Sequence, residues 1–292
     1  MLCRKCRTRL DPFLETVGSH PYCEPILPRE PQGVQLTFTY TSLHEGEDPE
    51  AVQIKKEIVD VVKFRDDRNP RSHQTNIGPS ELSSPCDRRI GYRLCGVRAI
   101  NTTLDPWPAI VGTAVHDWLE GAFLDWIKAT GSKDWVTETR LNLSDFVTGR
   151  SDLFNVPRGI VIDYKGVSPD KMKKIKAAGS PDNYRTQIQI YGLGYEKLGY
   201  TVNKVALAYF PRAGNIKDLH VEVFDYDRTV GLASLERVPR IAGQLLDLDP
   251  LSNPHRWEQV DASPTHDCGF CPWYNFRRTP ELGASDEGCP GK

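Results

Sequence analysis

The chain has 292 residues, of which 39% are hydrophobic, which is enough to build one large domain with small appendages. Its formal net charge of −2 provides no bulk attraction for polyanions, so any surface that binds nucleic acid has to be a local basic patch. No run approaches the ~18 consecutive apolar residues of a membrane span, and the first residues lack the apolar segment of an export signal. We therefore expect a cytoplasmic protein without membrane contact.

Eight cysteines in a chain expected in the reducing cytosol predict metal ligands rather than disulfides. Residues 1–30 hold three of them and too few apolar residues to fold without a metal. Two ligand pairs, Cys3 with Cys6 and His20 with Cys23, are separated by thirteen residues. This spacing predicts a small zinc knuckle (Zn²⁺) with a role in structure or docking.

The next segment, residues 31–76, is interpreted as a linker with a helical extension. A short β-prone run, Val34–Tyr40, precedes a charged stretch that is compatible with a helix up to about Arg68. The residues from Asn69 onward are polar and typical of a linker. The segment contains no catalytic pattern.

The main domain is expected over residues 77–292. Ser80 is expected to cap a helix that runs towards Cys95, and a turn at Ser144 and Asp145 should join the first two of three strands. The predicted ranges are 108–129 for the second helix, 135–143, 146–154 and 159–165 for the three strands, 183–198 for the next helix, 204–210 and 219–224 for two further strands, and 227–246 for the last helix. A helix between the third and fourth strands permits a parallel crossover, so we expect an α/β fold with a mixed sheet flanked by helices.

Two acids and a lysine carry the strongest chemical signal. Asp152 and Asp163 lie on neighbouring predicted strands, and paired carboxylates are suited to a hard divalent cation such as Mg²⁺ or Mn²⁺. Lys165 follows Asp163 by two residues, so both side chains leave the strand on one face. Alone, such a triplet is better explained as a strand-end acid and an exposed lysine. The apolar run 160–162 before Asp163 favours a functional pair, because an acid at the end of a buried strand needs a partner.

Two predicted helices supply further candidates. His116 precedes Glu120 by four positions, and its imidazole would suit manganese; the alternative is a partly buried histidine paired with Glu120. Gln187 and Tyr191 share a helical face, from which Gln187 would orient Lys165 or a water. Tyr191 would stack on a base or bond a phosphate, and its alternative is a half-buried core residue.

These motifs, in this order, resemble those of RecB-like nucleases in the PD-(D/E)xK superfamily. The matching segments are 112–116, 149–152, 163–165 and 187–191, and residues 79–86 are similar to the start of such domains. The resemblance covers roughly residues 77–290 and implies a restriction-endonuclease-like fold. It also implies that Asp152, Asp163, the carbonyl of Tyr164 and His116 hold the divalent metal, and that Lys165 positions or activates the attacking water. Asp163 stands where many members have glutamate.

The remaining cysteines bracket these motifs. Cys86 lies before them, and Cys268, Cys271 and Cys289 lie after them; four thiolates can bind zinc or an iron–sulfur cluster, and spacing does not distinguish the two. One cysteine before and three after resembles the 4Fe-4S clasp of AddB-type nucleases and CRISPR-associated exonucleases, which implies a cluster that ties the domain ends together. The interval from Cys271 to Cys289 is longer than is usual there. Cys95 is interpreted as a buried small apolar residue.

The predicted function is a metal-dependent exonuclease that hydrolyses phosphodiester bonds of single-stranded DNA or at DNA ends, in recombination, repair or CRISPR adaptation. Its partners would be DNA and a recombination or CRISPR adaptation protein, and it would act in the host cytoplasm if it is phage-encoded. The alternative is a non-catalytic DNA-end-binding or scaffold subunit of a recombination or replication complex. The basic residues expected to guide the strand are Arg88, Arg89, Arg150, Lys171, Lys173, Lys174, Lys176, Arg185 and Arg212.

Overall fold

The computed structural model of the protein describes residues 48–66, 76–101, 105–263, 268–278, 283–285 and 287–291. The predicted zinc ligands Cys3, Cys6, His20 and Cys23, and the run Val34–Tyr40, lie outside the described residues. The charged stretch after that run forms helix α1, Pro49–Asp66, which has no buried residue. None of the described helices combines the length and apolarity needed for a membrane span.

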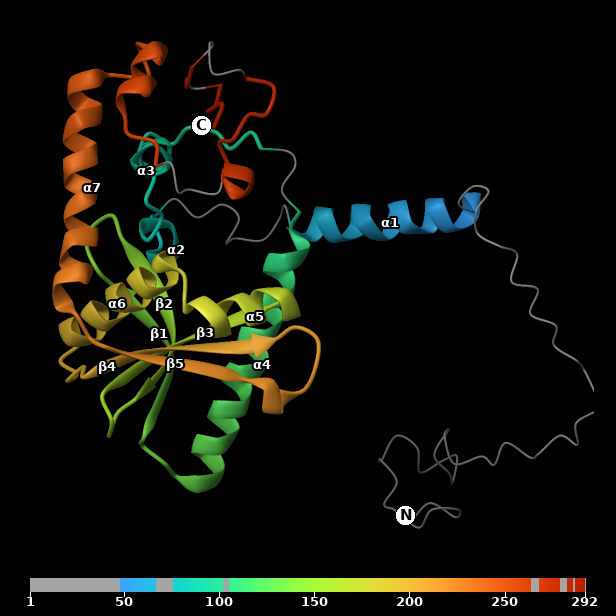
Figure 1. Ribbon diagram of the computed structural model, residues 1–292, viewed down its shortest axis with the longest axis vertical. Helices are drawn as coiled ribbons and strands as arrows, with labels where there is room; N and C mark the ends of the chain where they lie inside the picture. The colour runs from blue at the N-terminus through green and yellow to red at the C-terminus, as the bar shows by residue number, and fades with distance from the viewer. Residues whose placement is uncertain are drawn as a thin grey trace, which may run out of the picture. The chain divides into compact units, whose positions relative to one another are not determined.

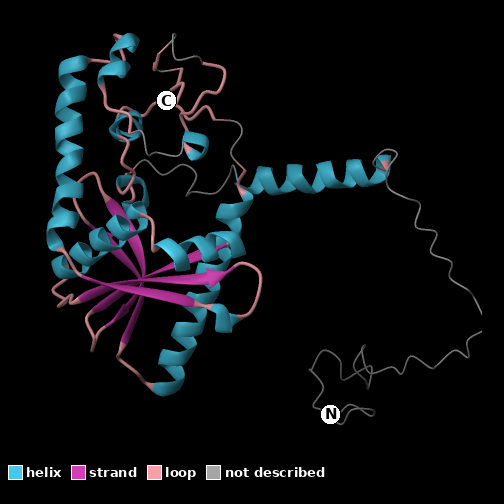
Figure 2. Cartoon of the chain, viewed as in Figure 1, coloured by secondary structure: helices cyan, strands magenta, loops and turns pink. Residues whose placement is uncertain are grey.

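A five-stranded mixed sheet, in the order β1-β2-β3-β4-β5, forms the centre of the remaining chain (Figure 2). β3 and β4 pair in parallel, and the other neighbours pair antiparallel. The parallel pair requires a crossover, which helices α5 and α6 provide, so the expected mixed sheet flanked by helices is confirmed. The strands are β1 Trp135–Asn142, β2 Thr148–Asn155, β3 Ile160–Val167, β4 Lys204–Pro211 and β5 His220–Asp225; the crossover helices are α5 Pro169–Ala178 and α6 Asp182–Lys197.

Helix α4 (Trp107–Thr130) and helix α6 contact opposite faces of this sheet, and helix α7 (Arg228–Leu248) packs against α6 (Figure 1). Leu119 of α4 packs in a small cluster with Tyr164 of β3, whereas Ile188 of α6 belongs to the main core with Val161. Because side chains alternate along a strand, Tyr164 faces α4 while Asp163 and Lys165 face α6. The alternation thus directs both charged residues of β3 towards one helix.

The predicted helix from Ser80 towards Cys95 is broken into α2 (Pro79–Leu82) and α3 (Asp87–Leu94). Pro85 lies between them, and proline disfavours helical geometry in the residue before it and removes a backbone donor. Ser80 lies inside α2, whose N-cap is Gly78, so the expected serine cap is wrong.

Helix α5 is absent from the predicted elements. Its lysine-rich sequence has only Met172 and Ile175 as buried anchors, which is too weak an apolar pattern to identify a helix. Ser168 caps it by accepting a hydrogen bond from the backbone N–H of Lys171, so this lysine cluster lies on a capped helix.

The C-terminal segment is anchored on α3 by aromatic rings. Tyr92 of α3 stacks on Trp257 with ring centroids 4.2 Å apart and on Trp273 at 5.7 Å. Both tryptophans are fully buried, and Trp257 lies in the 3₁₀ helix η5, Pro254–Gln259. Through these contacts the end of the chain returns to the segment that precedes the sheet.

Candidate active site

The β1–β2 hairpin brings two acids to the same point of the sheet. A turn of two residues, Ser144 and Asp145, would place Glu138 opposite Ser151, but the ladder instead pairs Asn142 with Thr148. The connection is therefore one residue longer than predicted, and Glu138 lies opposite Asp152, between the pairs Thr137–Leu153 and Thr139–Ser151. A shift of one residue changes which side chains meet across the strands. With the shorter, predicted turn, Glu138 would not have been placed opposite Asp152.

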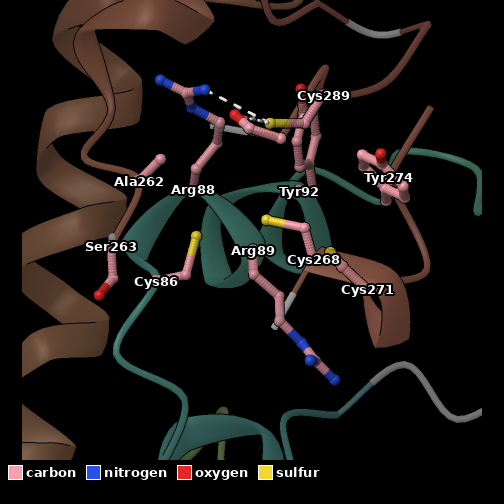
Figure 3. A pocket seen from close by; sticks show the side chains of 11 residues that line it. Cys86, Arg88, Arg89, Tyr92, Ala262, Ser263, Cys268, Cys271, Tyr274 and Cys289 are labelled. Atoms are coloured by element: carbon pink, nitrogen blue, oxygen red, sulfur yellow. Dashed lines mark hydrogen bonds between the residues drawn. The ribbon is translucent and has the colours of Figure 1, made fainter. Parts of the chain in front are cut away.

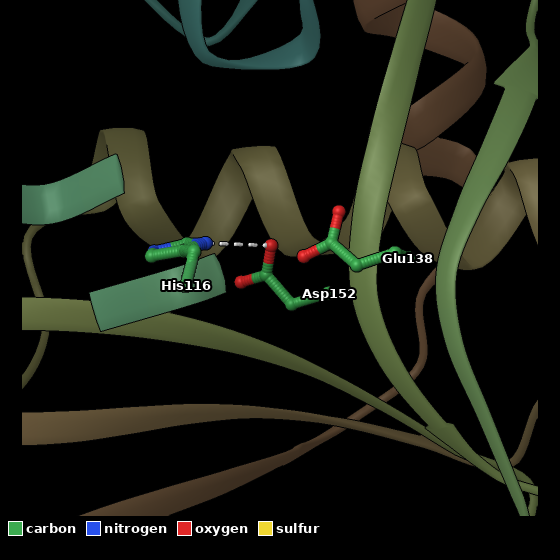
Figure 4. Close-up of side chains that lie close together, drawn as sticks. All are labelled: His116, Glu138 and Asp152. Carbon is green, nitrogen blue, oxygen red and sulfur yellow. Dashed lines mark hydrogen bonds and ion pairs between the residues drawn. The ribbon is translucent and has the colours of Figure 1, made fainter. Parts of the chain in front are cut away.

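Three potential metal ligands from three elements meet here (Figure 4). Asp152 of β2 lies between His116 of α4 and Glu138 of β1, and one donor atom from each lies within 4.8 Å of the others. The imidazole Nδ1 of His116 donates to Oδ1 of Asp152 over 3.1 Å. His116 thus pairs with Asp152 rather than with Glu120, the alternative considered from the sequence.

The second oxygen of Asp152 is held by the backbone of the next strand. The N–H of Tyr164 donates to Oδ2 of Asp152 over 2.6 Å. The β2–β3 ladder ends with the pair Leu153 and Ile162, directly before this contact. A side chain thus replaces the next ladder hydrogen bond, which fixes both oxygens of Asp152 in the space between the strands.

Glu138 was not predicted as a site residue, and its backbone is strained. Its φ of +48° lies in the left-handed region, which costs a non-glycine residue about 1–2 kcal/mol and is frequent at functional sites. The Arg150 side chain binds it twice, with Nε 3.0 Å from the carboxylate Oε2 and 3.2 Å from the carbonyl oxygen. Arg150 also lies 3.7 Å from Glu120. An expected strand-guiding arginine is therefore engaged with two acids.

A second group lies on the α6 side of β3. The ammonium Nζ of Lys165 is 2.6 Å from Oδ2 of Asp163 and donates to Oε1 of Gln187 over 2.9 Å. The amide Nε2 of Gln187 donates to Oδ1 of Asp163 and to the hydroxyl of Tyr191, each over 3.3 Å. Gln187 therefore bridges Asp163 and Lys165; its contact with Lys165 was expected from the sequence, whereas its contact with Asp163 was not.

Tyr191 itself is buried, with 6% of its surface exposed. Its ring lies in the main core, in agreement with the core alternative for this residue. A Cβ on Gly149 would lie 2.6 Å from Pro79 and 3.2 Å from the Tyr191 ring, so only glycine fits at this position of β2. The ring thus supports the strand that carries Asp152.

Burial and the neighbouring charge of Asp152 shift the pKa values of two acids of this site, Glu138 and Asp163, in the same direction. Burial raises the pKa of Glu138 to about 7, and Asp152 adds to the rise while Arg150 opposes it. Burial likewise raises the pKa of Asp163, although the Lys165 ammonium opposes it. Burial lowers the pKa of His116, but the hydrogen bond and charge of Asp152 outweigh it and raise that pKa. A positive charge placed among these groups would relieve the repulsion.

A pocket away from this site is lined by four of the cysteines (Figure 3). Cys86 is the N-cap of α3 and is buried, Cys268 begins the 3₁₀ helix η6 (Cys268–Phe270), and Cys271 follows it. Cys289 returns to them by a parallel bridge with Tyr274, despite its distance in sequence. Burial raises the pKa of the Cys271 thiol to about 11. The tertiary structure thus gathers the four cysteines grouped from the sequence.

Arg88 belongs to this pocket and not to a DNA-binding surface. It is buried, and its Nη1 donates to Sγ of Cys289 over 3.4 Å while Nε donates to the carbonyl oxygen of Val260 over 3.0 Å. Its expected role in guiding a strand is therefore wrong. Cys95 is half-buried at the edge of the core, and burial raises the pKa of its thiol.

No protein-family model matches the chain, and no curated protein matches it significantly. Among solved structures, SSO0001 is 21% identical with a TM-score of 0.41, covering 68% of this chain and 84% of that one. The alkaline exonuclease LHK-Exo from Laribacter hongkongensis is 14% identical with a TM-score of 0.42, covering 61% and 92%. A phage-related exonuclease from Haemophilus somnus 129PT is 15% identical with a TM-score of 0.38, covering 55% and 81%. At these low identities and TM-scores, the chemistry of this chain has to be inferred from its own side chains.

Proposed function

We propose that this chain is a divalent-metal-dependent deoxyribonuclease of the PD-(D/E)xK type, with a restriction-endonuclease-like nuclease domain over residues 77–292. The observation that carries the proposal is the contact chain Asp163–Lys165–Gln187 beside the group formed by His116, Glu138 and Asp152. A lysine held between an acid and an amide, next to three convergent metal donors, is an arrangement suited to phosphodiester hydrolysis.

The donor set fits Mg²⁺ or Mn²⁺. Carboxylate oxygens are the ligands of hard divalent ions, and an imidazole nitrogen extends the set towards manganese. Asp152, Asp163, the Tyr164 carbonyl and His116 would hold the ion, and Glu138 adds a carboxylate that the sequence motifs did not include. The bound ion would lower the pKa of a water and offset charge on the scissile phosphate.

The residues around the donors would orient the reaction. Lys165 would hold the attacking water or a phosphate oxygen through its ammonium, whose direction is set by Asp163 and Gln187. Because Gln187 Oε1 accepts from Lys165 and its Nε2 donates to Asp163, the amide fixes the lysine and the acid together. His116 would be oriented by its hydrogen bond to Asp152.

The test compares digestion of single-stranded DNA and of duplex ends by the wild-type protein with Mg²⁺, with Mn²⁺ and with EDTA. Lys165→Ala should lower the turnover by about 100-fold or more while DNA binding persists. Lys128→Ala, which removes an exposed lysine in the last turn of α4, is the matched control and should retain activity. Turnover retained by Lys165→Ala would overturn the assignment, and binding without cleavage by the wild type would favour the scaffold alternative.

We further propose that Cys86, Cys268, Cys271 and Cys289 hold a 4Fe-4S cluster. Four thiols from both sides of the catalytic segment line one pocket, and the guanidinium of Arg88 on Cys289 is suited to a thiolate ligand. A cluster there would link α3 to the end of the chain. Anaerobically purified protein should contain stoichiometric iron and sulfide with a band near ~400 nm, whereas zinc, a d¹⁰ ion without such absorption, would remove this assignment.

We propose that the protein acts on DNA in recombination, repair or CRISPR adaptation, as predicted from the sequence. The proposal also keeps Zn²⁺ at the N-terminal knuckle, formed by residues outside the described part of the chain. Metal analysis of a variant lacking residues 1–30 tests the knuckle, because loss of one zinc per chain with iron unchanged is expected.

A further inference from the structure

We propose that Lys171 and Tyr184 form a second phosphate seat beside Lys165, which binds the phosphate adjacent to the scissile one in a single DNA strand. The inference rests on the proposed nuclease function and deepens it. It assigns a binding role to two residues outside the nuclease motifs, one in α5 and one in the first turn of α6.

One aromatic ring connects the two lysines. The Nζ of Lys165 lies 4.9 Å from the centroid of the Tyr184 ring, and the Nζ of Lys171 lies 4.6 Å from the same centroid. Lys171 also donates to the Tyr184 hydroxyl over 2.5 Å, so its ammonium lies at the hydroxyl end of the ring. Tyr184 therefore holds a second ammonium group at a short distance from the catalytic lysine.

The two ammonium groups differ in their partners. Lys165 is paired with Asp163 and hydrogen-bonded to Gln187, so its charge is compensated within the protein. In the described part of the chain, Lys171 has no carboxylate partner, and Tyr184 is its hydrogen-bond acceptor. An exposed ammonium with hydrogens to spare beside a second cation is a site for an external anion.

The hydroxyl of Tyr184 adds a donor to this seat. Its oxygen accepts from Lys171, and no residue that the structure describes accepts its own hydrogen. The O–H of Tyr184 and the remaining N–H groups of Lys171 can therefore point at one oxyanion, which charge-assisted hydrogen bonds stabilise. Phosphate oxygens accept several such bonds at once.

The seat lies at the edge of the sheet where the parallel strands β3 and β4 both end. Val167 pairs with Pro211 there. The N-cap Ser168 starts α5 directly after β3, and this places Lys171, in the first turn of α5, close to the end of β3. Arg212 follows β4; its backbone N–H donates to the carbonyl oxygen of Val167 over 2.9 Å, and a Cβ on Gly166 would lie 3.4 Å from its Nε, so its side chain passes close to the end of β3. Cations from a strand, a helix and a loop at one edge match the repeated negative charge of a nucleic acid strand.

The experiment measures binding of a short fluorescently labelled single-stranded oligonucleotide, without added divalent metal, over a series of salt concentrations. Lys171→Gln should weaken binding about tenfold and reduce the salt slope by about 0.7, the value for one phosphate contact on a single strand. Tyr184→Phe keeps the ring and loses the hydroxyl, so binding should weaken about threefold. Lys171→Arg keeps the positive charge, so this variant should retain most of the wild-type affinity for the oligonucleotide.

Lys128→Gln is the matched control, because it removes the same charge from an exposed position in the last turn of α4, outside the residues expected to guide the strand. Binding by this variant should stay within about twofold of the wild type. Equal losses for Lys171→Gln and Lys128→Gln would overturn the seat and indicate diffuse electrostatic attraction. Replacing the phosphate next to the cleaved bond with one neutral methylphosphonate linkage should weaken DNA binding by the wild type but not by Lys171→Gln.

The outcomes separate this inference from the function on which it rests. If the wild type cleaves DNA and Lys171→Gln binds equally well, the seat is wrong and the nuclease proposal stands. If the wild type neither binds nor cleaves DNA, both are wrong. Circular dichroism melting of each variant verifies folding, which the exposed position of Lys171 should preserve.

Discussion

Replacing Glu138 with glutamine should stabilise the metal-free protein at pH 8 and also weaken its binding of Mn²⁺. Burial raises the pKa of Glu138 from 4.5 to about 7, with a contribution from Asp152. The pKa of Glu138 is higher in the folded than in the unfolded protein. The contribution of this side chain to stability is therefore complete below pH ~4.5, where the carboxyl is neutral in both states, and it is lost as the pH rises through about 7. At pH 8 the wild-type protein therefore contains an ionised carboxylate that is unfavourable without a metal.

The expected gain in unfolding free energy for Glu138→Gln follows from the pKa difference of Glu138 between the folded and unfolded states. At about 1.4 kcal/mol per pH unit, the difference between 4.5 and about 7 gives an upper value of about 3 kcal/mol. The exposed side of Arg150 and the surrounding solvent screen part of the repulsion, so we expect about 2 kcal/mol. For a chain of this size the melting temperature should rise by roughly 4–8 °C.

The assay is thermal unfolding in EDTA at pH 5 and pH 8, together with titration of Mn²⁺ by calorimetry. Glu138→Gln should exceed the wild type in stability at pH 8 and match it near pH 5, while its affinity for Mn²⁺ falls about tenfold or more. Glu120→Gln is the control, because Glu120 also lies near Arg150, at 3.7 Å, but is not among the three convergent donors. It should change neither quantity markedly.

Two results would refute this reasoning. Equal stability of Glu138→Gln and the wild type at pH 8 would mean that neither burial nor the charge of Asp152 disfavours the ionised carboxylate in the metal-free protein. Unchanged affinity for Mn²⁺ would mean that Glu138 is not a ligand. A purely structural acid, whose loss only destabilises the fold, would produce neither of the two expected changes.

Three further outcomes are expected. Gly149→Ala should destabilise the protein by about 1–3 kcal/mol in urea unfolding, because the new Cβ would lie 2.6 Å from Pro79; an unchanged midpoint would mean that α2 moves away freely. Asp87→Asn should lower the unfolding free energy by about 2 kcal/mol, since it breaks the 2.6 Å ion pair with Arg237 that joins α3 to α7, and equal stability would contradict this link. Cys271→Ser should lose iron and visible absorption, and retention of both would exclude Cys271 as a ligand.

The periodicity of the sequence was sufficient to predict most of the secondary structure. Helix α6 was expected over 183–198 and occupies Asp182–Lys197, and β4 was expected over 204–210 and occupies Lys204–Pro211. Strand alternation also predicted a shared face for Asp163 and Lys165, and helical spacing predicted one for Gln187 and Tyr191. These patterns depend on neighbours along one element, so they can be read without the fold.

What the sequence could not supply depends on contacts between distant segments. Glu138 joins the acids only because the β1–β2 turn is one residue longer than expected, and a slip of one residue has no strong local signature. Arg88 is held in the cysteine pocket, 201 residues before its partner Cys289, although its charge favoured a surface role. Local patterns determine helices and strands, whereas the register and long-range packing that bring side chains together are decided by the tertiary structure.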